Sequence, residues 1–541
     1  MSSAIDPQAL ASVSRQSAGS VSSSAAVGNR SGVLQRISVY PATAMAVSLS
    51  GVMLVFLAFI RLWPTDLWDH LNYGRRILAT GELFRTEPLL PLSEGMPMVN
   101  IPWLSQVILE LLHARIGLSA LQFAAGLCGA FTALLLGLRA CRRSHSAFAA
   151  ATAVIVFFVF NREELQIIRP QLAGLVCYSI VLWWVFGNAP HRRRWWIMLP
   201  VLFALWSNLH GSFIVGLFAM GTAAAGRLID SLIRTRSLLH SLRDRSLIRT
   251  ILLTQLCAAA ALLNPWGPAV YTEVLNFSSN PNLASMFEWD ALSIRGPRGQ
   301  DAAAVLALLF FATAVTPRRI RTMEVLLLAV TGYQAAWSGR MLNWWIPPAA
   351  LFVAIHVSAA LRHRRRRRLR TSASPSLKWT MLSLAALLLC LQLNPLVARL
   401  RSGARLTDVQ ALSPQTPIDT VSFLNELESL PEGPIFIRAE WAGYLMNRGP
   451  AGLTTMVNLH VHAISEEVWN SYISLHEGHP GWERRLDDYS INVAILCKNT
   501  QGLLIREMKQ SADWKILRED RQAVVLQRKY PLSQLSTPPS P

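Results

Sequence analysis

The sequence predicts a polytopic α-helical membrane bundle of about eleven spans, followed by a small extracytoplasmic α/β domain at the C-terminal end. Three observations carry this prediction. Of the 541 residues, 52% are hydrophobic and only 15% are charged, whereas soluble domains average about 25% charged residues. Eleven apolar runs lie between residues 43 and 398, most of them near the length of about 20 residues that a membrane span requires. From about residue 399 the composition becomes that of a soluble domain.

The predicted spans alternate with clusters of arginine. The spans lie at 43–62, 118–138, 146–160, 171–188, 195–209, 211–229, 250–266, 301–316, 322–338, 342–361 and 377–397. With a cytoplasmic N-terminus, the cytoplasmic loops are the arginine-rich segments 139–145, 189–194, 230–249, 317–321 and 362–376, as the positive-inside rule requires. The odd number of spans then places residues 399–541 outside the cytoplasm. We therefore expect a multi-pass membrane protein whose N-terminus is cytoplasmic.

The net charge of +19 is explained by these loops and requires no nucleic-acid partner. A polybasic segment beside a span, such as 362–370, binds anionic lipids, and an RNA-binding tail is the less favoured alternative. Residues 1–42 are rich in Ser and Ala and are predicted to be a disordered cytoplasmic tail. The six cysteines show no metal-ligand spacing, so no metal site is predicted from them.

Unusual polar clusters gather on the extracytoplasmic side of the predicted bundle. They are "DLWDHLNYGRRIL" (66–78), "NREELQIIRPQ" (161–171), "WSNLHGS" (206–212), "NPWG" (264–267), "FEWD" (287–290) and "SGRMLNWW" (338–345). Charged groups held against a bilayer are costly, so a function is expected to require them. A transporter would place such groups near the midplane, on broken helices. Their position at one rim predicts an active site that faces outward at the level of the lipid headgroups.

These motifs, in this order, resemble bacterial membrane proteins of the GT-C glycosyltransferase superfamily. The resemblance begins with the Asp-x-Trp-Asp-His pattern at 66–70 and covers most of the chain. It continues through "NIPWLSQVILELL" (100–112), "RPQ" (169–171), "SNLHGSF" (207–213), "NPWG", "EW" (288–289) and "AEWAGYLMNRGP" (439–450). It implies a multispanning bundle (43–398) in a bacterial inner membrane, a long first outer loop (63–117) with a functional carboxylate, and a C-terminal outer domain (399–541).

The resemblance also implies an activity. Members typically move a sugar from a polyprenyl-phosphate carrier to a lipid, glycan or protein acceptor. The carboxylate of the first outer loop acts as general base, or in some branches as a ligand of a divalent metal, and Asp66 is the position that would carry this role. The chain departs from related sequences at "VNLHVHAISEE" (457–467), where Asn458 stands in place of an acidic residue.

Asp66, Asp69 and His70 are the candidate catalytic residues. On a helix, positions i, i+3 and i+4 share a face, so these three side chains are expected to point together into a cavity. A carboxylate there would act as a base if it lay within hydrogen-bond reach of an acceptor hydroxyl. Alternatively, Asp66 caps the helix that begins here, and His70 binds a metal or a lipid phosphate or satisfies a neighbouring group.

Arg169, Arg340 and Arg162 are the candidates for binding the donor phosphate. A phosphate leaving group needs fixed positive charge, and guanidinium supplies it in bidentate form. The alternative is that these long cationic side chains snorkel to lipid headgroups.

His210, Glu288 and Trp289 are the candidates for binding the acceptor or the sugar. Glu288 would supply a second carboxylate and Trp289 a ring on which a sugar stacks. Alternatively, Trp289 is one of the aromatic residues common at membrane interfaces. Asn208, close to His210, is expected to join helices by hydrogen bonds.

Alternating strands and helices predict the C-terminal α/β domain. The predicted strands are 434–439, 454–459, 492–498, 514–520 and 523–528, and the predicted helices are 419–430, 465–477 and 501–511. His460 and His462 lie two residues apart, whereas a helical metal site places histidines four apart. A structural or acceptor-recognition role is therefore preferred for this segment.

Together with the resemblance, the sequence predicts a membrane glycosyltransferase that uses a polyprenyl-phosphate sugar and inverts the sugar carbon by single displacement. The alternative is a non-catalytic envelope protein or a polyprenyl-lipid transporter with the same bundle. These classes diverge at Asp66, which only the enzyme needs for its chemistry.

Overall fold

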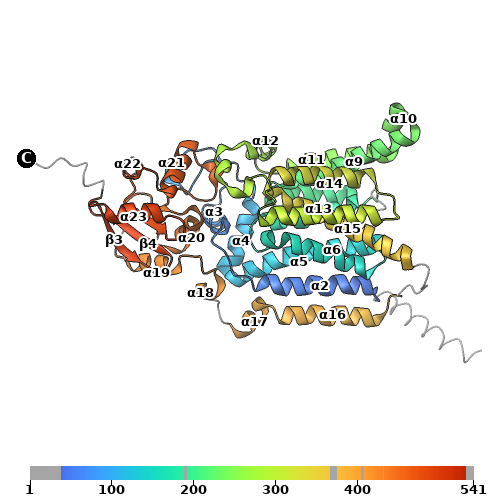
Figure 1. Ribbon diagram of the computed structural model, residues 1–541, viewed down its shortest axis with the longest axis horizontal. Helices are drawn as coiled ribbons and strands as arrows, with labels where there is room; N and C mark the ends of the chain where they lie inside the picture. The colour runs from blue at the N-terminus through green and yellow to red at the C-terminus, as the bar shows by residue number, and fades with distance from the viewer. Residues whose placement is uncertain (1–37, 188–191, 366–373, 404–406, 430–431, 532–541) are drawn as a thin grey trace, which may run out of the picture.

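The fold is a bundle of roughly parallel helices with a small mixed domain at one end (Figure 1). The computed structural model describes residues 38–187, 192–365, 374–403, 407–429 and 432–531. Most of the predicted N-terminal tail and residues 366–373 of the polybasic run lie outside the described residues.

Each of the eleven predicted apolar runs lies in a helix. The helices are α2 (Pro41–Ala58), α5 (Leu118–Ser144), α6 (Ala147–Leu165), α7 (Gln171–Val185), α8 (Trp195–Leu209), α9 (Phe213–Thr235), α11 (Arg245–Ala261), α13 (Pro297–Val315), α14 (Thr322–Trp337), α15 (Leu342–Arg365) and α16 (Leu377–Gln392). Within the described residues, five helical segments are long and apolar enough to cross a membrane alone, and a sixth is formed if α16 is joined to α17 (Pro395–Ser402) across a 61° bend. The number of spans therefore stays a prediction, whereas the predicted bundle of apolar helices is confirmed.

Helix α15 lies at the centre of the bundle, in contact with α5, α6, α13 and α14. Its apolar window is 83% buried, against 22% for the window in α13. A helix that is apolar on all sides has no polar face to present to solvent, so it is stable in the interior. The more exposed α13 lies at the edge, where lipid would cover it.

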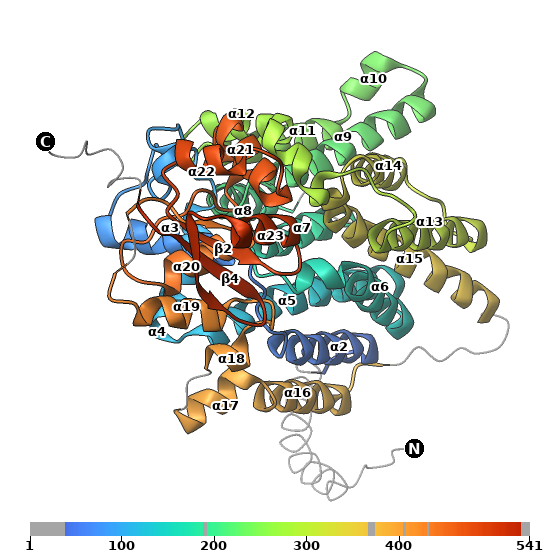
Figure 2. The same ribbon diagram turned by 60° about the vertical axis from the view of Figure 1, so that its left-hand side comes forward.

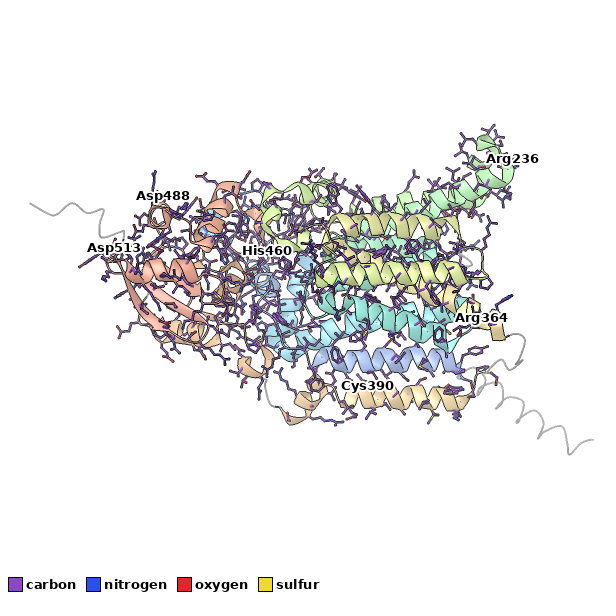
Figure 3. All side chains as sticks on the ribbon, viewed as in Figure 1. Arg236, Arg364, Cys390, His460, Asp488 and Asp513 are labelled. Atoms are coloured by element: carbon purple, nitrogen blue, oxygen red, sulfur yellow. The ribbon has the colours of Figure 1, made fainter. Side chains whose placement is uncertain are left out.

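The two ends of the bundle differ in charge. Figure 3 shows Arg236 and Arg364 at one end, together with the short helix α10 (Leu238–Leu242) labelled in Figure 1. The opposite end carries α3 (Leu67–Thr80), α4 (Trp103–Arg115), α12 (Ala269–Asn276) and the C-terminal domain. The polar motifs of the first and fourth predicted outer loops therefore lie at the end away from these arginines.

The C-terminal domain contains a four-stranded sheet in the order β1-β2-β4-β3. Strands β1 (Phe436–Ile437) and β2 (Val493–Cys497) are parallel, while β4 (Ala523–Arg528) pairs antiparallel with β2 and with β3 (Trp514–Glu519). The helices around it are α18 (Asp408–Ala411), α19 (Ile418–Glu426), α20 (Ala439–Arg448), α21 (Glu466–Glu477), α22 (Trp482–Asp488) and α23 (Gly502–Gln510). All five residues of β2 are buried, which places this strand in the core of the domain.

The predicted strand at 454–459 is wrong. This segment makes one isolated bridge, from Thr455 to Ile435. Beyond that bridge the chain turns toward the bundle, because the backbone N–H of Leu459 donates to Asp69 Oδ2 at 3.2 Å. A single turn of 3₁₀ helix, Val461–Ala463, follows. The apolar alternation that indicated a strand is therefore used to pack a loop against α3.

Helix α20 packs against α3 and joins the domain to the bundle. Asn72 donates from Nδ2 to the carbonyl of Gly443 at 3.0 Å, and Asn447 donates to Asn72 Oδ1 at 2.8 Å. A Cβ added at Gly443 would lie 2.5 Å from Asp69 Oδ1 and 2.8 Å from the Asp69 backbone nitrogen. Only a residue without a side chain allows the two helices to come this close.

We predict that Gly443→Ala lowers the stability of the protein. Alanine normally stabilises a helix interior by about 1 kcal/mol relative to glycine, but here the added methyl collides with Asp69, and such overpacking costs about 1–3 kcal/mol. The thermal midpoint of the purified protein in detergent measures the effect. Gly502→Ala is the matched control, since a Cβ at Gly502 meets no atom within 4 Å. A Gly443→Ala protein as stable as the control would show that the two helices do not pack in this way.

Candidate functional site

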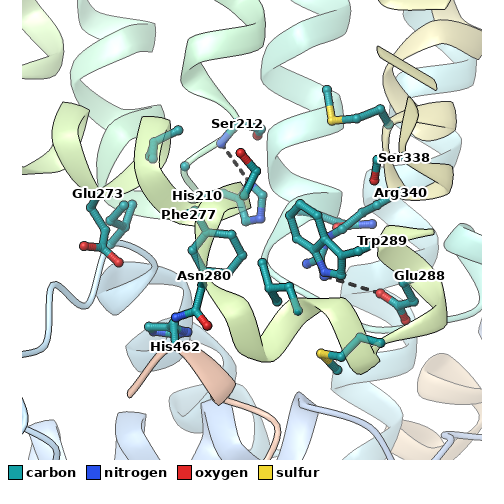
Figure 4. A pocket seen from close by; sticks show the side chains of 18 of the residues that line it. His210, Ser212, Glu273, Phe277, Asn280, Glu288, Trp289, Ser338, Arg340 and His462 are labelled. Carbon is teal, nitrogen blue, oxygen red and sulfur yellow. Dashed lines mark hydrogen bonds and ion pairs between the residues drawn. The ribbon is translucent and has the colours of Figure 1, made fainter. Parts of the chain in front are cut away.

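A cavity of about 1090 Å³ lies between the end of the bundle and the C-terminal domain. It is lined by the start of α3, the α6–α7, α8–α9 and α14–α15 links, the segment after α12, and residues 459–462 of the C-terminal domain. Seven of the nine predicted site residues line it: Asp66, His70, Arg169, His210, Glu288, Trp289 and Arg340. Figure 4 shows part of this group around the cavity.

Arg169 is the centre of an ion-pair network in the cavity wall. Its Nε donates to Asp66 Oδ1 at 2.8 Å, and its Nη1 and Nη2 donate to the two carboxylate oxygens of Glu288 at 3.0 and 3.1 Å. Arg340 Nη1 also donates to Glu288 Oε2, at 3.3 Å. Two guanidinium groups and two carboxylates therefore form a cluster without net charge, at side-chain exposures between 10% and 24%.

Glu288 is ionised by its neighbours. Burial alone would raise the pKa of Glu288, but the charges of Arg169 and Arg340 outweigh burial and lower the pKa to about 2. For Arg169, burial lowers the pKa, whereas Asp66 and Glu288 raise it and prevail. The network thus keeps Glu288 and Arg169 charged despite their burial.

Asp66 precedes the first residue of α3, but its side chain makes no capping hydrogen bond. Its carboxylate contacts Arg169 instead, and Oδ2 lies 3.9 Å from His70 Nε2. His70 Nδ1 lies 3.3 Å from Gln106 Nε2. The capping alternative that the sequence left open is therefore not the one that this structure adopts.

Asp69 lies on the same helix but faces the C-terminal domain. It is 1% exposed and does not line the cavity. Oδ2 accepts from the Leu459 backbone, whereas Oδ1 has no hydrogen-bond partner among the described residues. Burial raises the pKa of Asp69 well above its usual range, against the lowering effect of the Leu459 hydrogen bond. The structure thus places Asp69 where it positions the loop that begins at residue 459.

Four histidines line the cavity, namely His70, His210, His460 and His462. Burial, reinforced mainly by Arg169 for His70 and by Arg340 for His210, lowers both pKa values to about 3. Burial and Arg340 lower the pKa of His462 to about 4. These rings are therefore neutral at physiological pH. Since His210 Nδ1 accepts from the Ser212 backbone at 3.0 Å, its Nε2 carries the hydrogen and can donate it.

Aromatic rings form one wall of the cavity. The Arg340 guanidinium lies 5.2 Å from the centre of the Trp289 ring, and the Phe277 ring lies 5.5 Å from Trp289 and 5.4 Å from His462. Sequence reasoning missed Phe277 and the cavity-lining carboxylate of Glu273, because neither belongs to a charged or repeated motif.

Arg162 lies outside the cavity lining. Its Nη1 donates to Asp301 Oδ2 at 2.8 Å, so it joins α6 to α13.

Asn208 accepts from Trp103 Nε1 at 2.8 Å and donates to the Leu263 carbonyl at 3.2 Å. It therefore joins the end of α8 to α4 and to the segment after α11 by hydrogen bonds. Within the described part of the chain, no group of three His, Cys, Asp or Glu residues is arranged to hold a metal ion.

Comparison with known proteins identifies the fold. No family model matches the sequence, and no curated protein matches it as a relative. The oligosaccharyltransferase of Archaeoglobus fulgidus in its apo form aligns over 84% of this chain and 69% of its own, at 12% identity and a TM-score of 0.51. The archaeal oligosaccharyltransferase AglB from Archaeoglobus fulgidus, in complex with an inhibitory peptide and a dolichol-phosphate, aligns over the same shares at 11% identity and a TM-score of 0.50.

ArnT from Cupriavidus metallidurans, bound to undecaprenyl phosphate, aligns over 89% of this chain and 97% of its own at 15% identity and a TM-score of 0.49. The likeness to the oligosaccharyltransferase shows that the chain shares the fold of that enzyme. The resemblance drawn from the order of the sequence motifs implied a fold of this kind.

We predict that His70 makes the stability of the protein fall on acidification. An unfolded histidine has a pKa of about 6.5, whereas the folded pKa of His70 is about 3. Between these values the unfolded chain takes up the proton and the folded chain does not, so the free energy of unfolding decreases as pH falls through this window. From pH 6.5 to pH 5 this amounts to about 2 kcal/mol.

The thermal midpoints of wild type and His70→Gln at pH 7 and pH 5 measure this contribution. The variant is expected to lose less stability on acidification than wild type. His479→Gln, which removes an exposed histidine of the C-terminal domain, is the control and is expected to follow wild type. An equal loss in His70→Gln and wild type would contradict the burial of a neutral ring at this position.

Proposed function

We propose that the protein is a membrane glycosyltransferase that moves a sugar from a polyprenyl-phosphate carrier to an acceptor outside the cytoplasm. The observation that carries the proposal is the pair of guanidinium groups, Arg169 and Arg340, held beside two carboxylates in one cavity. The fold supports it, since AglB of the same fold was solved with a dolichol-phosphate.

The charge distribution indicates on which side of the membrane the cavity would lie. Arg236 and Arg364 mark the end of the bundle opposite to the C-terminal domain (Figure 3), and arginine-rich loops stay on the cytoplasmic side of a membrane. The cavity then opens on the outer face of a bacterial inner membrane, where the acceptor would be a glycan, a lipid or a protein.

Arg340 and Arg169 would hold the donor phosphate. A sugar linked to a polyprenyl phosphate is a phosphodiester with one negative charge, and departure of the sugar leaves a monoester with a second charge. Fixed guanidinium groups stabilise this added charge as it develops. Arg340 is the more available of the two, because its contact with Glu288 is 3.3 Å long, whereas Arg169 makes three contacts of 2.8–3.1 Å.

Asp66 would act as the general base. The acceptor oxygen bonds to the anomeric carbon while the bond from that carbon to the phosphate oxygen breaks, and the acceptor proton passes to the Asp66 carboxylate. Asp66 Oδ1 accepts from Arg169. A phosphate that takes over the Arg169 contact would free Asp66 for the acceptor, so donor binding would prepare the base.

The rival class is a polyprenyl-lipid transporter or a non-catalytic envelope protein with the same bundle. A transporter is expected to carry its charged groups near the membrane midplane. Here the ion-pair network lines the cavity between the end of the bundle and the C-terminal domain, which favours chemistry at the surface.

We predict that Asp66→Asn lowers glycosyl transfer by about 10²–10⁴-fold, the usual contribution of a positioned general base. Transfer is followed as the change in envelope glycans and in lipid-linked sugars when a deletion strain is complemented with each variant. Asp301→Asn is the matched control, because Asp301 pairs with Arg162 outside the cavity lining. If Asp66→Asn complements as well as Asp301→Asn at equal expression, Asp66 is not the base. That result would favour a transporter or a non-catalytic envelope protein.

A further inference from the structure

We propose that the donor's sugar binds to the wall formed by Trp289, Phe277, His462 and His460, and that this wall selects an uncharged pyranose. We call these four residues the aromatic wall. The inference rests on the proposed function, since it takes the network of Arg169 and Arg340 as the phosphate site.

The position of the wall follows from the chemistry of the donor. A glycosyl phosphate places its sugar ring one oxygen away from the phosphorus atom. The Trp289 ring lies 5.2 Å from the Arg340 guanidinium, so a phosphate held by Arg340 brings the attached sugar next to Trp289. Figure 4 shows Trp289 beside Arg340 and Glu288, with Phe277 and His462 farther along the same side of the cavity.

The rings of the wall follow one another at contact distance. Phe277 lies 5.5 Å from Trp289 and 5.4 Å from His462, and His462 lies 5.5 Å from His460. Sugars present C–H groups on one face of the ring, and such a face packs on an aromatic surface through apolar contact. The row extends from Trp289, beside Arg340, to the two histidines that the C-terminal domain supplies.

Two separate parts of the chain supply the wall. Trp289 and Phe277 belong to the segment after α12, whereas His460 and His462 belong to the C-terminal domain. Asn282 joins these parts, because its Nδ2 donates to the carbonyls of Val461 and Ile464 at 2.9 and 2.8 Å. Asp69 holds the same loop through Leu459. The C-terminal domain therefore completes the cavity, and the sugar site does not exist without it.

The charges around the wall favour an uncharged sugar. Burial lowers the pKa of His460 well below its usual range and that of His462 to about 4, so the wall carries no positive charge at neutral pH. A uronate carboxylate packed on His460 and His462 would lose hydration without meeting a positive charge on those rings. A hexose hydroxyl, in contrast, can accept a hydrogen bond from the Nε2–H of His210.

The test compares three ligands that differ only in what the phosphate carries. The probes are a short-chain prenyl phosphate and the same lipid phosphate carrying glucose or glucuronate, and their binding to the purified full chain is measured by calorimetry. Wild type is expected to bind the glucose-bearing lipid at least about tenfold more tightly than the glucuronate-bearing lipid, a difference of about 1.4 kcal/mol.

Phe277→Leu removes a ring of the wall but keeps an apolar side chain. It is expected to weaken binding of the glucose-bearing lipid about three- to tenfold, as for loss of one stacking contact, and to leave binding of the bare prenyl phosphate unchanged. Phe277→Tyr keeps the ring and is expected to bind as wild type does, so it separates stacking from folding. Phe287→Leu is the matched control in the same segment, because Phe287 is 74% exposed and does not line the cavity.

The outcomes separate the two proposals. Arg340→Gln is expected to weaken binding of all three lipids, and binding that is independent of Arg340 would overturn the phosphate site and the sugar site with it. If Arg340→Gln weakens binding but Phe277→Leu affects glucose-bearing and bare lipid alike, the phosphate site stands and the aromatic wall is not the sugar site. Equal affinity of wild type for the glucose- and glucuronate-bearing lipids would overturn the selection of an uncharged sugar.

Discussion

The contacts of Arg169 with Asp66 and Glu288 are the interaction on which the rest of the site depends. They join three segments that are far apart in the sequence, and Arg340 adds a fourth. Burying an ion is costly, and removing one partner of a buried pair typically destabilises by about 3–5 kcal/mol because the other charge is left uncompensated. The network is tolerable because its charges sum to zero. A bound phosphate would disturb that balance, which gives the cluster a way to respond to substrate.

Helix α3 connects this network to the C-terminal domain. Asp66 and His70 face the cavity from its first turn, while Asp69 accepts from the Leu459 backbone on the domain side. The loop that Asp69 holds carries His460 and His462 into the same cavity. Asp69, Gly443 and Asn282 do not line the cavity, but their contacts hold the loop and the domain that bring His460 and His462 into it.

Sequence patterns predicted the helices of the bundle because a membrane span needs a long apolar run, and such runs are visible in the sequence itself. They also predicted Asp66, Arg169, Glu288 and Arg340 as site candidates, because charged residues at the ends of apolar runs are rare.

The sequence could not predict which side chains contact one another across the fold. Helical spacing placed Asp66 and Asp69 on one face, but the neighbour that each side chain meets depends on tertiary packing. Arg162 pairs with Asp301, and Phe277 has no motif to reveal it. The alternation at 454–459 indicated a strand, although that segment serves the interface with α3.

The most direct test of the central claim is a structure of the protein, determined by cryo-electron microscopy in lipid, with a prenyl phosphate bound. The phosphate oxygens should lie at hydrogen-bond distance, about 2.7–2.9 Å, from guanidinium nitrogens of Arg169 and Arg340, and Asp66 should be released from Arg169. A phosphate bound at the opposite, arginine-rich end of the bundle, with the contacts of Arg169 unchanged, would contradict the account.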